Sequence, residues 1–278
     1  MKALKILTQS VSVKQSRGLG TIFRFEFYEH IRNRWLPVYA LLYLILGNLI
    51  AYLGGSNPMQ ASSSLLSLVL LLTPITALLA ASISFNESLP FMELLVSLPV
   101  SRLAIYLGKW LGLSCGLAIS YLIGMGGTLI WLDADATGLT SIVLMLVLGV
   151  MLTFVFTSIA YALTGLARRR EIVYGISLGI WFFLFIVYDL LIIGIVLLFG
   201  DYPLETPIFI LSAANPLDLT RIVMMLHMDL SALMGYTAAV FQHTLGGTGG
   251  ILLSITLLSL WIIVPLAGGY HLFARRSL

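Results

Sequence analysis

Charged residues are scarce in this sequence: they make up 10% of its 278 residues, whereas 59% are hydrophobic. A soluble domain carries roughly a quarter charged residues, which it needs to cover its surface. The composition therefore excludes a soluble globule. The net charge of +3 is too small to indicate nucleic acid binding, so only the placement of the charges is informative.

Several kinds of site are missing as well. The single cysteine, Cys115, excludes a disulfide or a thiolate metal cluster within one chain. No lysine precedes Ser or Thr, so the Gly-x-x-x-x-Gly-Lys-Ser/Thr phosphate loop is missing, and no His-Glu-x-x-His zinc motif occurs. We expect no catalytic residue and no cofactor bound by this chain, so a separate ATPase subunit would have to hold any ATP and magnesium.

What the sequence does contain is a set of long hydrophobic stretches. A helix needs about 20 mostly apolar residues to cross the hydrocarbon core of a bilayer. Six stretches satisfy this, which predicts an all-α integral membrane protein with six transmembrane helices. They lie near residues 36–54, 63–84, 110–132, 139–166, 172–199 and 251–273.

The basic residues predict an orientation for these spans. Fourteen of the fifteen Lys and Arg residues fall on one side of the six-span arrangement, and only Arg221 falls on the other. The positive-inside rule then places both termini and the loops at 85–109 and 167–171 in the cytoplasm. The loop at 200–250, which holds four of the twelve acidic residues, is expected on the outer side.

The segment before the first span carries a helical pattern. Residues 1–35 are expected to form a cytoplasmic N-terminus and an amphipathic elbow helix, followed by a six-helix transmembrane domain over 36–278. In the elbow, Arg and Glu alternate with apolar residues at helical spacing, which suits a helix that lies in the interface with its Arg at lipid headgroups. A simple topogenic anchor is the alternative. The apolar positions are Ile22, Phe23, Phe27, Ile31 and Trp35.

The cytoplasmic loop at 85–109 is too long for a turn and too polar for a span. Its pattern predicts two short helices with a proline break between them, the second with Ser101 as N-cap. Such helices would present a ledge to a cytoplasmic partner or pack on the headgroups. The apolar face of the first would consist of Phe91, Leu94, Leu95 and Leu98.

The outer loop at 200–250 predicts an amphipathic helix. Asn215 is the expected N-cap, Pro216 fits the first helical position, and Asp218 suits the first turn. The apolar stripe would need a cover of lipid, another subunit or a partner protein. The Gly-Gly-Thr-Gly-Gly segment at 246–250 is expected to be a flexible linker. The stripe comprises Leu219, Ile222, Val223, Leu226 and Leu230.

Two further features are candidates for function. Asp189 is the one acidic residue well inside a predicted span, which marks a transport path, a subunit contact or a hydrogen bond to a neighbouring helix. Met224, His227 and Met228 share a helical face, and thioether with imidazole suits Cu(I), although methionine is also common on protein contact surfaces.

Two stretches resemble the ABC-2 type permeases, the membrane subunits of ABC exporters. One is Glu93-Leu94-Leu95 with Ser97-Leu98-Pro99-Val100-Ser101-Arg102 and Gly108-Lys109. The other is Asn215-Pro216-Leu217-Asp218 with Arg221 and then Gly235-Tyr236, which resembles the NosY-type permeases of the nitrous oxide reductase maturation system.

The resemblance implies a homodimer in a bacterial plasma membrane, a cytoplasmic ABC ATPase under the first loop, and a periplasmic partner on the outer helix. It also implies a role in assembling the copper site of the reductase. A general exporter of lipids, peptides or drugs is the alternative, and a secondary transporter without ATPase is a further one. ATPase coupling is expected at Glu87, Glu93, Pro99, Ser101 and Arg102, and partner docking at Asn215, Asp218, Arg221 and Tyr236.

Overall fold

The protein is helical throughout the part that its structure describes. The computed structural model describes residues 18–32, 35–53, 58–89, 91, 92, 100–129, 136–166, 169–199, 205–227 and 236–275. Apart from short turns these residues are helical, and no strand occurs among them. Six helical stretches are long and apolar enough to cross a membrane, which confirms the predicted fold class.

The helices follow one another with short connections. They are an N-terminal helix (residues 18–32), α2 (Trp35–Leu53), α3 (Pro58–Glu87), α5 (Arg102–Leu129), α6 (Ala136–Leu166), α7 (Arg170–Phe182), the π-helix η1 (Phe183–Val187), α8 (Tyr188–Phe199), α9 (Glu205–Ala213), α10 (Pro216–His227) and α11 (Tyr236–Arg275). Helices α7, η1 and α8 run without a break and together form the fifth candidate span.

Two boundaries differ from the sequence-based expectation. The third span begins at Arg102 rather than near residue 110, because the expected second short helix of the loop is the first part of α5. The glycine-rich segment at 246–250 lies inside α11, so the prediction of a flexible linker there was wrong. Glycine disfavours a helix by about 1 kcal/mol per residue, so the local preference of this segment does not decide its state within the longer helix that continues on both sides of it.

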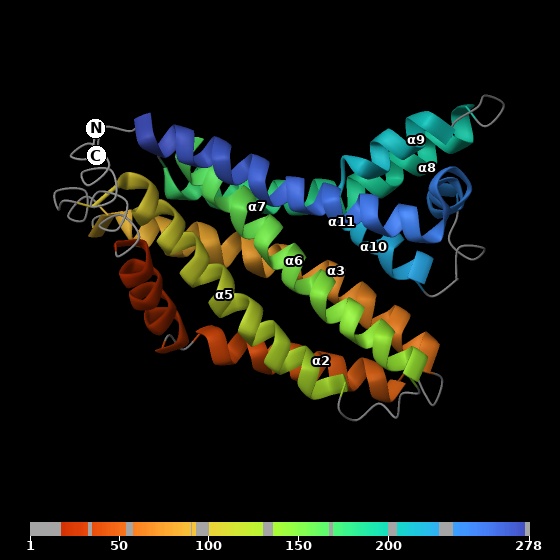
Figure 1. Cartoon of the computed structure of the whole chain (residues 1–278), viewed down its shortest axis with the longest axis horizontal. Helices are drawn as coiled ribbons and strands as arrows, with labels where there is room; N and C mark the ends of the chain where they lie inside the picture. Colours follow the sequence, from red (N-terminus) through yellow and green to blue (C-terminus); the bar gives the residue numbers. More distant parts are fainter. Residues whose placement is uncertain are drawn as a thin grey trace, which may run out of the picture.

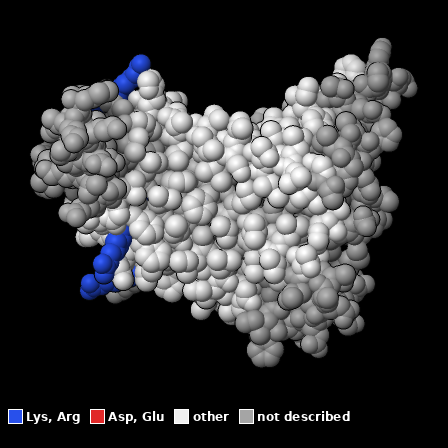
Figure 2. Space-filling model, in the orientation of Figure 1, with Lys and Arg blue, Asp and Glu red and all other residues white. Residues whose placement is uncertain are grey.

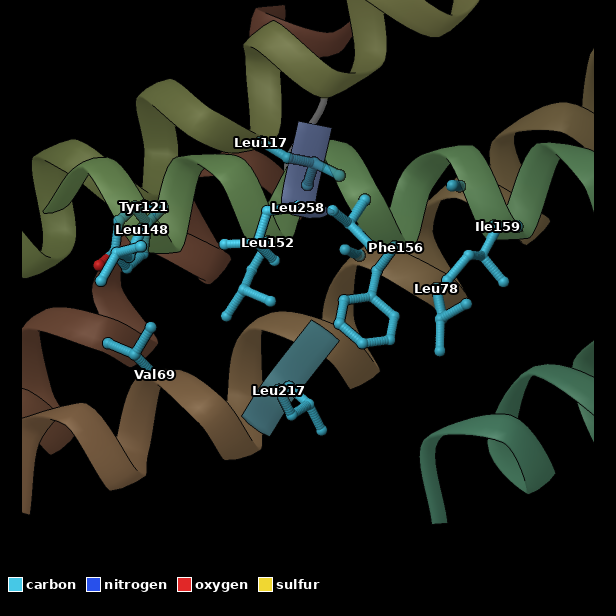
Figure 3. Close-up of a cluster of buried hydrophobic side chains, with 14 of the residues drawn as sticks. Val69, Leu78, Leu117, Tyr121, Leu148, Leu152, Phe156, Ile159, Leu217 and Leu258 are labelled. Atoms are coloured by element: carbon cyan, nitrogen blue, oxygen red, sulfur yellow. The ribbon is translucent and has the colours of Figure 1, made fainter. Parts of the chain in front are cut away.

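Helix α6 occupies the centre of the bundle (Figure 1). It contacts α3, α5, α7, α10 and α11, and its sequence is apolar on every side, as a helix enclosed by others requires. Figure 3 shows the core around it, in which side chains from five helices meet. The labelled ones are Val69 and Leu78 of α3, Leu117 and Tyr121 of α5, Leu148, Leu152, Phe156 and Ile159 of α6, Leu217 of α10 and Leu258 of α11.

A ridge of small residues on α5 holds two other helices close to it. The ridge consists of Gly108, Gly112, Gly116, Ser120, Gly124 and Thr128, which lie four residues apart and so share one face. A Cβ atom on Gly112 would lie 2.6 Å from the Cβ of Glu26, and one on Gly124 would lie 2.3 Å from the carbonyl oxygen of Ala40. The N-terminal helix and α2 therefore lie on the same face of α5 at backbone distance (Figure 1).

The buried face of the N-terminal helix differs from the predicted one. Ile22, Glu26 and His30 pack on the α5 ridge, each less than 9% exposed, whereas Ile31 is 45% exposed. The predicted apolar stripe is thus rotated partly outward. The physical reason is that the α5 ridge offers a polar partner, Lys109, beside the position of Glu26.

The described basic residues other than Arg221 gather at one end of the bundle, which we name the basic end. The N-terminal helix, the start of α5, the start of α7 and the end of α11 all lie there, and the Lys and Arg atoms visible in Figure 2 are at this end. On the face shown in Figure 2, no Lys, Arg, Asp or Glu is visible in the middle. The described basic residues at this end that are not buried are Arg24, Arg32, Arg102, Arg169, Arg170 and Arg275.

Candidate functional sites at the two ends of the bundle

A buried ion pair joins the N-terminal helix to α5 at the basic end. Lys109 donates from Nζ to Oε1 of Glu26, and both side chains are almost fully enclosed, at 2% and 3% exposure. His30, one turn after Glu26, places Nε2 3.8 Å from the other carboxylate oxygen, and Ser84 of α3 lies 3.4 Å from the same nitrogen. The cluster thus connects three helices.

Burial sets the protonation of this cluster. Loss of hydration raises the pKa of Glu26, and the ammonium of Lys109 limits the rise. Loss of hydration, reinforced by the charge of Lys109, lowers the pKa of His30 to about 4, so His30 is neutral at physiological pH. The cluster therefore holds one cation and one acid beside a neutral imidazole.

The chain just after α3 rests on this cluster. Phe91 stacks on Phe25 of the N-terminal helix, with ring centroids 5.7 Å apart, and the Lys109 ammonium lies 5.8 Å from the centroid of the Phe91 ring. Met92 is fully buried next to it, and its amide donates to the Ser88 carbonyl oxygen at 2.9 Å. One side of the loop between α3 and α5 is therefore anchored on the N-terminal helix and α5 together.

The start of α5 is capped as predicted and is tied to α11. The amide of Ala104 donates to Oγ of Ser101 at 3.2 Å, which confirms Ser101 as the N-cap. Arg102 donates from Nη1 to the carbonyl oxygen of Ala274 at 2.8 Å, so it closes the last turn of α11. Of the other residues expected to couple to an ATPase, Glu87 is exposed at the end of α3, and Glu93 and Pro99 lie outside the described residues.

At the opposite end, Asn215 organises the start of α10 as the sequence predicts. Its Oδ1 accepts from the amide of Leu217 at 3.0 Å, which makes it the N-cap, and Pro216 is the first helical residue. Its Nδ2 donates to the carbonyl oxygen of Leu184 at 3.0 Å. Leu184 belongs to η1, where the wider helical turn leaves carbonyl groups without their usual partners. Asn215 therefore joins α10 to the fifth span.

Among the described residues, the basic residue at this end, Arg221, is paired with Asp189, which lies well inside the fifth span. Arg221 donates from Nη1 to both carboxylate oxygens of Asp189, at 3.1 and 3.3 Å, and to Oδ1 of Asp218 at 3.3 Å. Of the alternatives for Asp189, a bond to a neighbouring helix is thus observed. Burial raises the pKa of Asp218 to about 7, with Arg221 opposing the rise and Asp189 adding to it.

Further hydrogen bonds fix the hairpin of α9 and α10 to the bundle. Tyr188, next to Asp189 in α8, donates to the carbonyl oxygen of Leu211 at 2.6 Å, and Trp261 of α11 donates to that of Ala213 at 3.4 Å. With the contacts of Asn215 and Arg221, four side chains hold the 205–227 hairpin. The hairpin is therefore attached to the fifth span and to α11.

The apolar stripe of α10 is covered by this chain itself. Leu219, Ile222 and Val223 are at most 2% exposed, because α10 packs against α11 and α6. Among the expected docking residues, Asn215 and Asp218 are 0% and 5% exposed, so in this arrangement they touch their own chain. The Arg221 side chain is 33% exposed. Tyr236 opens α11, and its side chain lies outside the described part.

The residues considered for Cu(I) are not assembled among the described ones. Met224 is fully buried in the hydrophobic core, whereas His227 is half-buried at the end of α10. Met228 lies outside the described residues. Within the described part of the chain no group of three His, Cys, Asp or Glu residues is placed to hold a metal ion.

Sequence reasoning missed the pair of Glu26 and Lys109. Glu26 was assigned to the solvated face of an amphipathic helix, and Lys109 to the cytoplasmic end of a span. One signal was available: Gly108 and Gly112 flank Lys109 in a small-residue pattern that invites a closely packed helix, and such a helix needs a partner for a charge beside it.

These features define a helical membrane subunit with a basic, loop-bearing end and, at the opposite end, a hairpin that hydrogen bonds attach to the spans. The chain belongs to the ABC-2 family of transporter proteins, whose family model, described as ABC-2 family transporter protein, matches residues 20–278. It is accordingly a permease subunit of an ABC transporter, a family in which a partner subunit carries the ATPase.

Two curated proteins within the ABC transporter permeases are similar to this chain along nearly its whole length. The "Probable ABC transporter permease protein NosY" of Pseudomonas aeruginosa is 30% identical over 274 residues, which cover 93% of this chain and 98% of that protein. The protein of the same name from Stutzerimonas stutzeri is 31% identical over 274 residues, which cover 92% of this chain and 97% of that protein.

Proposed function

We propose that this chain is the permease of a homodimeric ABC complex in the bacterial inner membrane that assists assembly of the copper site of nitrous oxide reductase. The observation that carries the proposal is the attachment of the 205–227 hairpin to the spans. Its anchoring residues, Asn215, Asp218 and Arg221, belong to the stretch that resembles the NosY-type permeases. The similarity to two permeases named NosY along nearly their whole lengths supports it.

The basic end faces the cytoplasm in this proposal. The positive-inside rule favours that orientation, and the loop after α3 then lies where an ATPase subunit can bind. ATP and magnesium belong to that subunit, and this chain itself performs no chemistry. The residues expected to couple to the ATPase remain Glu87, Glu93, Pro99, Ser101 and Arg102. Ser101 and Arg102 would act through the start of α5.

The hairpin of α9 and α10 is the proposed docking platform for a periplasmic partner. Because four side chains attach it to α8, η1 and α11, a tilt of these helices changes its position. Among the described side chains of the expected docking set, Arg221 reaches the surface, and His227 ends the same helix. A Cu(I) role for Met224 would require α10 to move out of the core.

The side of α7 that points away from α3 has the small residues that a homodimer contact between helices requires. Val173 and Ser177 are buried against α3, whereas Gly175 and Gly179 on the other side have nothing within 4 Å of the position of a Cβ atom. Two glycines four residues apart let a second helix approach closely. Gly179→Leu should therefore reduce dimer recovery in a crosslinking assay, and an unchanged dimer fraction would remove this face from the interface.

The test of the function combines recovery of partners with the state of the reductase. Tagged protein is isolated from its native membrane in mild detergent, and every copurifying chain is identified. Copper per reductase is then measured in a strain lacking this permease and in the strain restored with the wild type or with Arg221→Gln. Gly126→Ala is the matched control, because nothing lies within 4 Å of that added methyl group.

We expect an ATPase and a periplasmic protein to copurify, and the copper content to fall without the permease. Arg221→Gln should lower it in part. Normal copper content without the permease, with an ATPase as the only partner, would replace the proposal by a general exporter of lipids, peptides or drugs. Recovery of no ATPase would point to a stand-alone secondary transporter.

A further inference from the structure

The buried Lys109 contacts an aromatic ring in addition to the acid that balances its charge. A lysine that is 2% exposed needs an acid partner, which Glu26 supplies, yet its ammonium also faces the ring of Phe91 from the cytoplasmic loop. We propose that Phe91 and Lys109 form the joint that transmits movement of this loop to α5 and the N-terminal helix. The proposal rests on the proposed binding of an ATPase at the loop.

The loop side of the joint is held between two surfaces. The Phe91 ring is 40% exposed, so one face is open to a partner while the other stacks on Phe25 and meets Lys109. Behind it, the hydrogen bonds from Ser88 to Ser84 and from Met92 to Ser88 continue the end of α3. A push on the loop therefore reaches α3 through the backbone and α5 through the Phe91 ring.

The membrane side of the joint has no freedom to slip. A Cβ atom on Gly108 would lie 2.9 Å from Cγ2 of Ile22, and the corresponding position on Gly112 is blocked by Glu26. The N-terminal helix, α2 and α5 therefore move as one body. Towards α6, α5 is held by the hydroxyl contact of Ser114 with Thr157 at 2.8 Å and by the bond from Tyr121 to the carbonyl oxygen of Met145 at 3.1 Å. The joint thus acts on a body that also contacts the central helix α6.

The contact of Phe91 with Lys109 transmits a signal only if it differs between ATPase states. Its chemistry permits that, because a cation over an aromatic face depends on alignment and is lost when the ring tilts away. Phe91 and Lys109 are positioning residues in this view: they do not touch ATP or a transported species. The test must therefore separate transmission from folding and from ATP hydrolysis.

The experiment uses the whole complex with its ATPase subunit in lipid nanodiscs. Spin labels are placed at the outer end through Tyr52→Cys and Leu197→Cys, both at least 80% exposed, in a Cys115→Ser background. Distances between the labels are measured with and without trapped ATP. ATPase binding and hydrolysis are measured on the same samples.

We expect Phe91→Leu to reduce the ATP-dependent change in the label distance about two- to fivefold, in line with the size of a partly exposed cation–π contact. ATPase binding should stay intact. Phe91→Tyr should keep the wild-type response, because it retains the aromatic ring. The double variant Glu26→Gln with Lys109→Gln removes the cation without leaving a lone buried charge and should lose the response as Phe91→Leu does.

Two results would overturn the joint. One is a full distance change in Phe91→Leu with the ATPase bound, which leaves the proposed function standing. The other is an equal loss in Phe91→Leu and Phe91→Tyr, since the ring is then irrelevant. If no ATPase binds to the wild-type protein, the proposed function fails and the joint fails with it.

Discussion

Asn215 and Leu184 are 31 positions apart in the chain, yet Nδ2 of the asparagine donates to the carbonyl oxygen of the leucine at 3.0 Å. Oδ1 of the same side chain caps α10 through the amide of Leu217. One buried amide thus supports both the π-helix in the fifth span and the start of the outer hairpin. Substitutions of Asn215 that remove only Nδ2, and substitutions that remove both Nδ2 and Oδ1, should therefore lower stability by different amounts.

We expect Asn215→Asp to destabilise the outer hairpin by about 1–3 kcal/mol, because the cap acceptor remains while the Leu184 carbonyl loses its donor. Asn215→Ala should cost roughly 1 kcal/mol more through loss of the cap. Thermal unfolding in detergent, together with hydrogen exchange of α10, measures both. Equal stability of Asn215→Asp and the wild type would show that the bond to Leu184 contributes nothing.

The ridge on α5 provides a matched pair of glycine substitutions. In Gly124→Ala the new methyl group would lie 2.3 Å from the carbonyl oxygen of Ala40, so α2 must move away, at a cost of roughly 1–3 kcal/mol. Gly126→Ala meets nothing within 4 Å and should be neutral or slightly stabilising, because alanine favours a helix. Melting temperatures of the two variants side by side give the answer, and similar values would contradict the close approach of α2.

Asp218 gives the outer hairpin a dependence on pH. Its pKa is about 7 in the fold and near 3.8 when free, so between these values the folded chain binds the extra proton. The contribution to stability is therefore fully present below about pH 4 and is lost as the pH rises through about 7. Asp218→Asn should remove this loss, so its stability relative to the wild type should increase between about pH 5 and about pH 8.

The comparison has to be made between variants, because His30 acts in the opposite direction. Its pKa falls to about 4 in the fold from 6.5, so its contribution is present above about 6.5 and is lost as the pH falls towards 4. His30 is the same in the wild type and in Asp218→Asn and cancels in the difference. A difference in melting temperature that does not vary with pH would refute the assignment to Asp218.

Arg102 should matter for the end of α11 as well as for any ATPase. Loss of its bond to the Ala274 carbonyl in Arg102→Ala is expected to weaken the last turn of α11 by about 0.5–1.5 kcal/mol. Hydrogen exchange of the peptide that ends at Arg275 should become faster, with Arg102→Lys intermediate between the two. Unchanged exchange combined with reduced ATPase coupling would assign Arg102 to the partner contact alone.

Local signals allowed much of this structure to be predicted. The six spans follow from hydropathy, and the start of α10 follows from Asn215 and Pro216, whose preferences are local. The partner of Asp189 was not predictable, because it requires knowing that α10 packs against the fifth span. The helical state of residues 246–250 was also missed, since the local propensity of glycine does not indicate that α11 continues on both sides of this segment.

Glu26 and Lys109 are 83 positions apart in the chain, so their contact forms late during synthesis of the protein. At about 5–20 residues per second, the ribosome delivers Lys109 roughly 4–17 s after Glu26. During that interval Lys109 is not available to pair with the Glu26 carboxylate, and burial of an unpaired carboxylate is costly. The N-terminal helix therefore remains at the membrane surface and packs on α5 only after the third span has been synthesised.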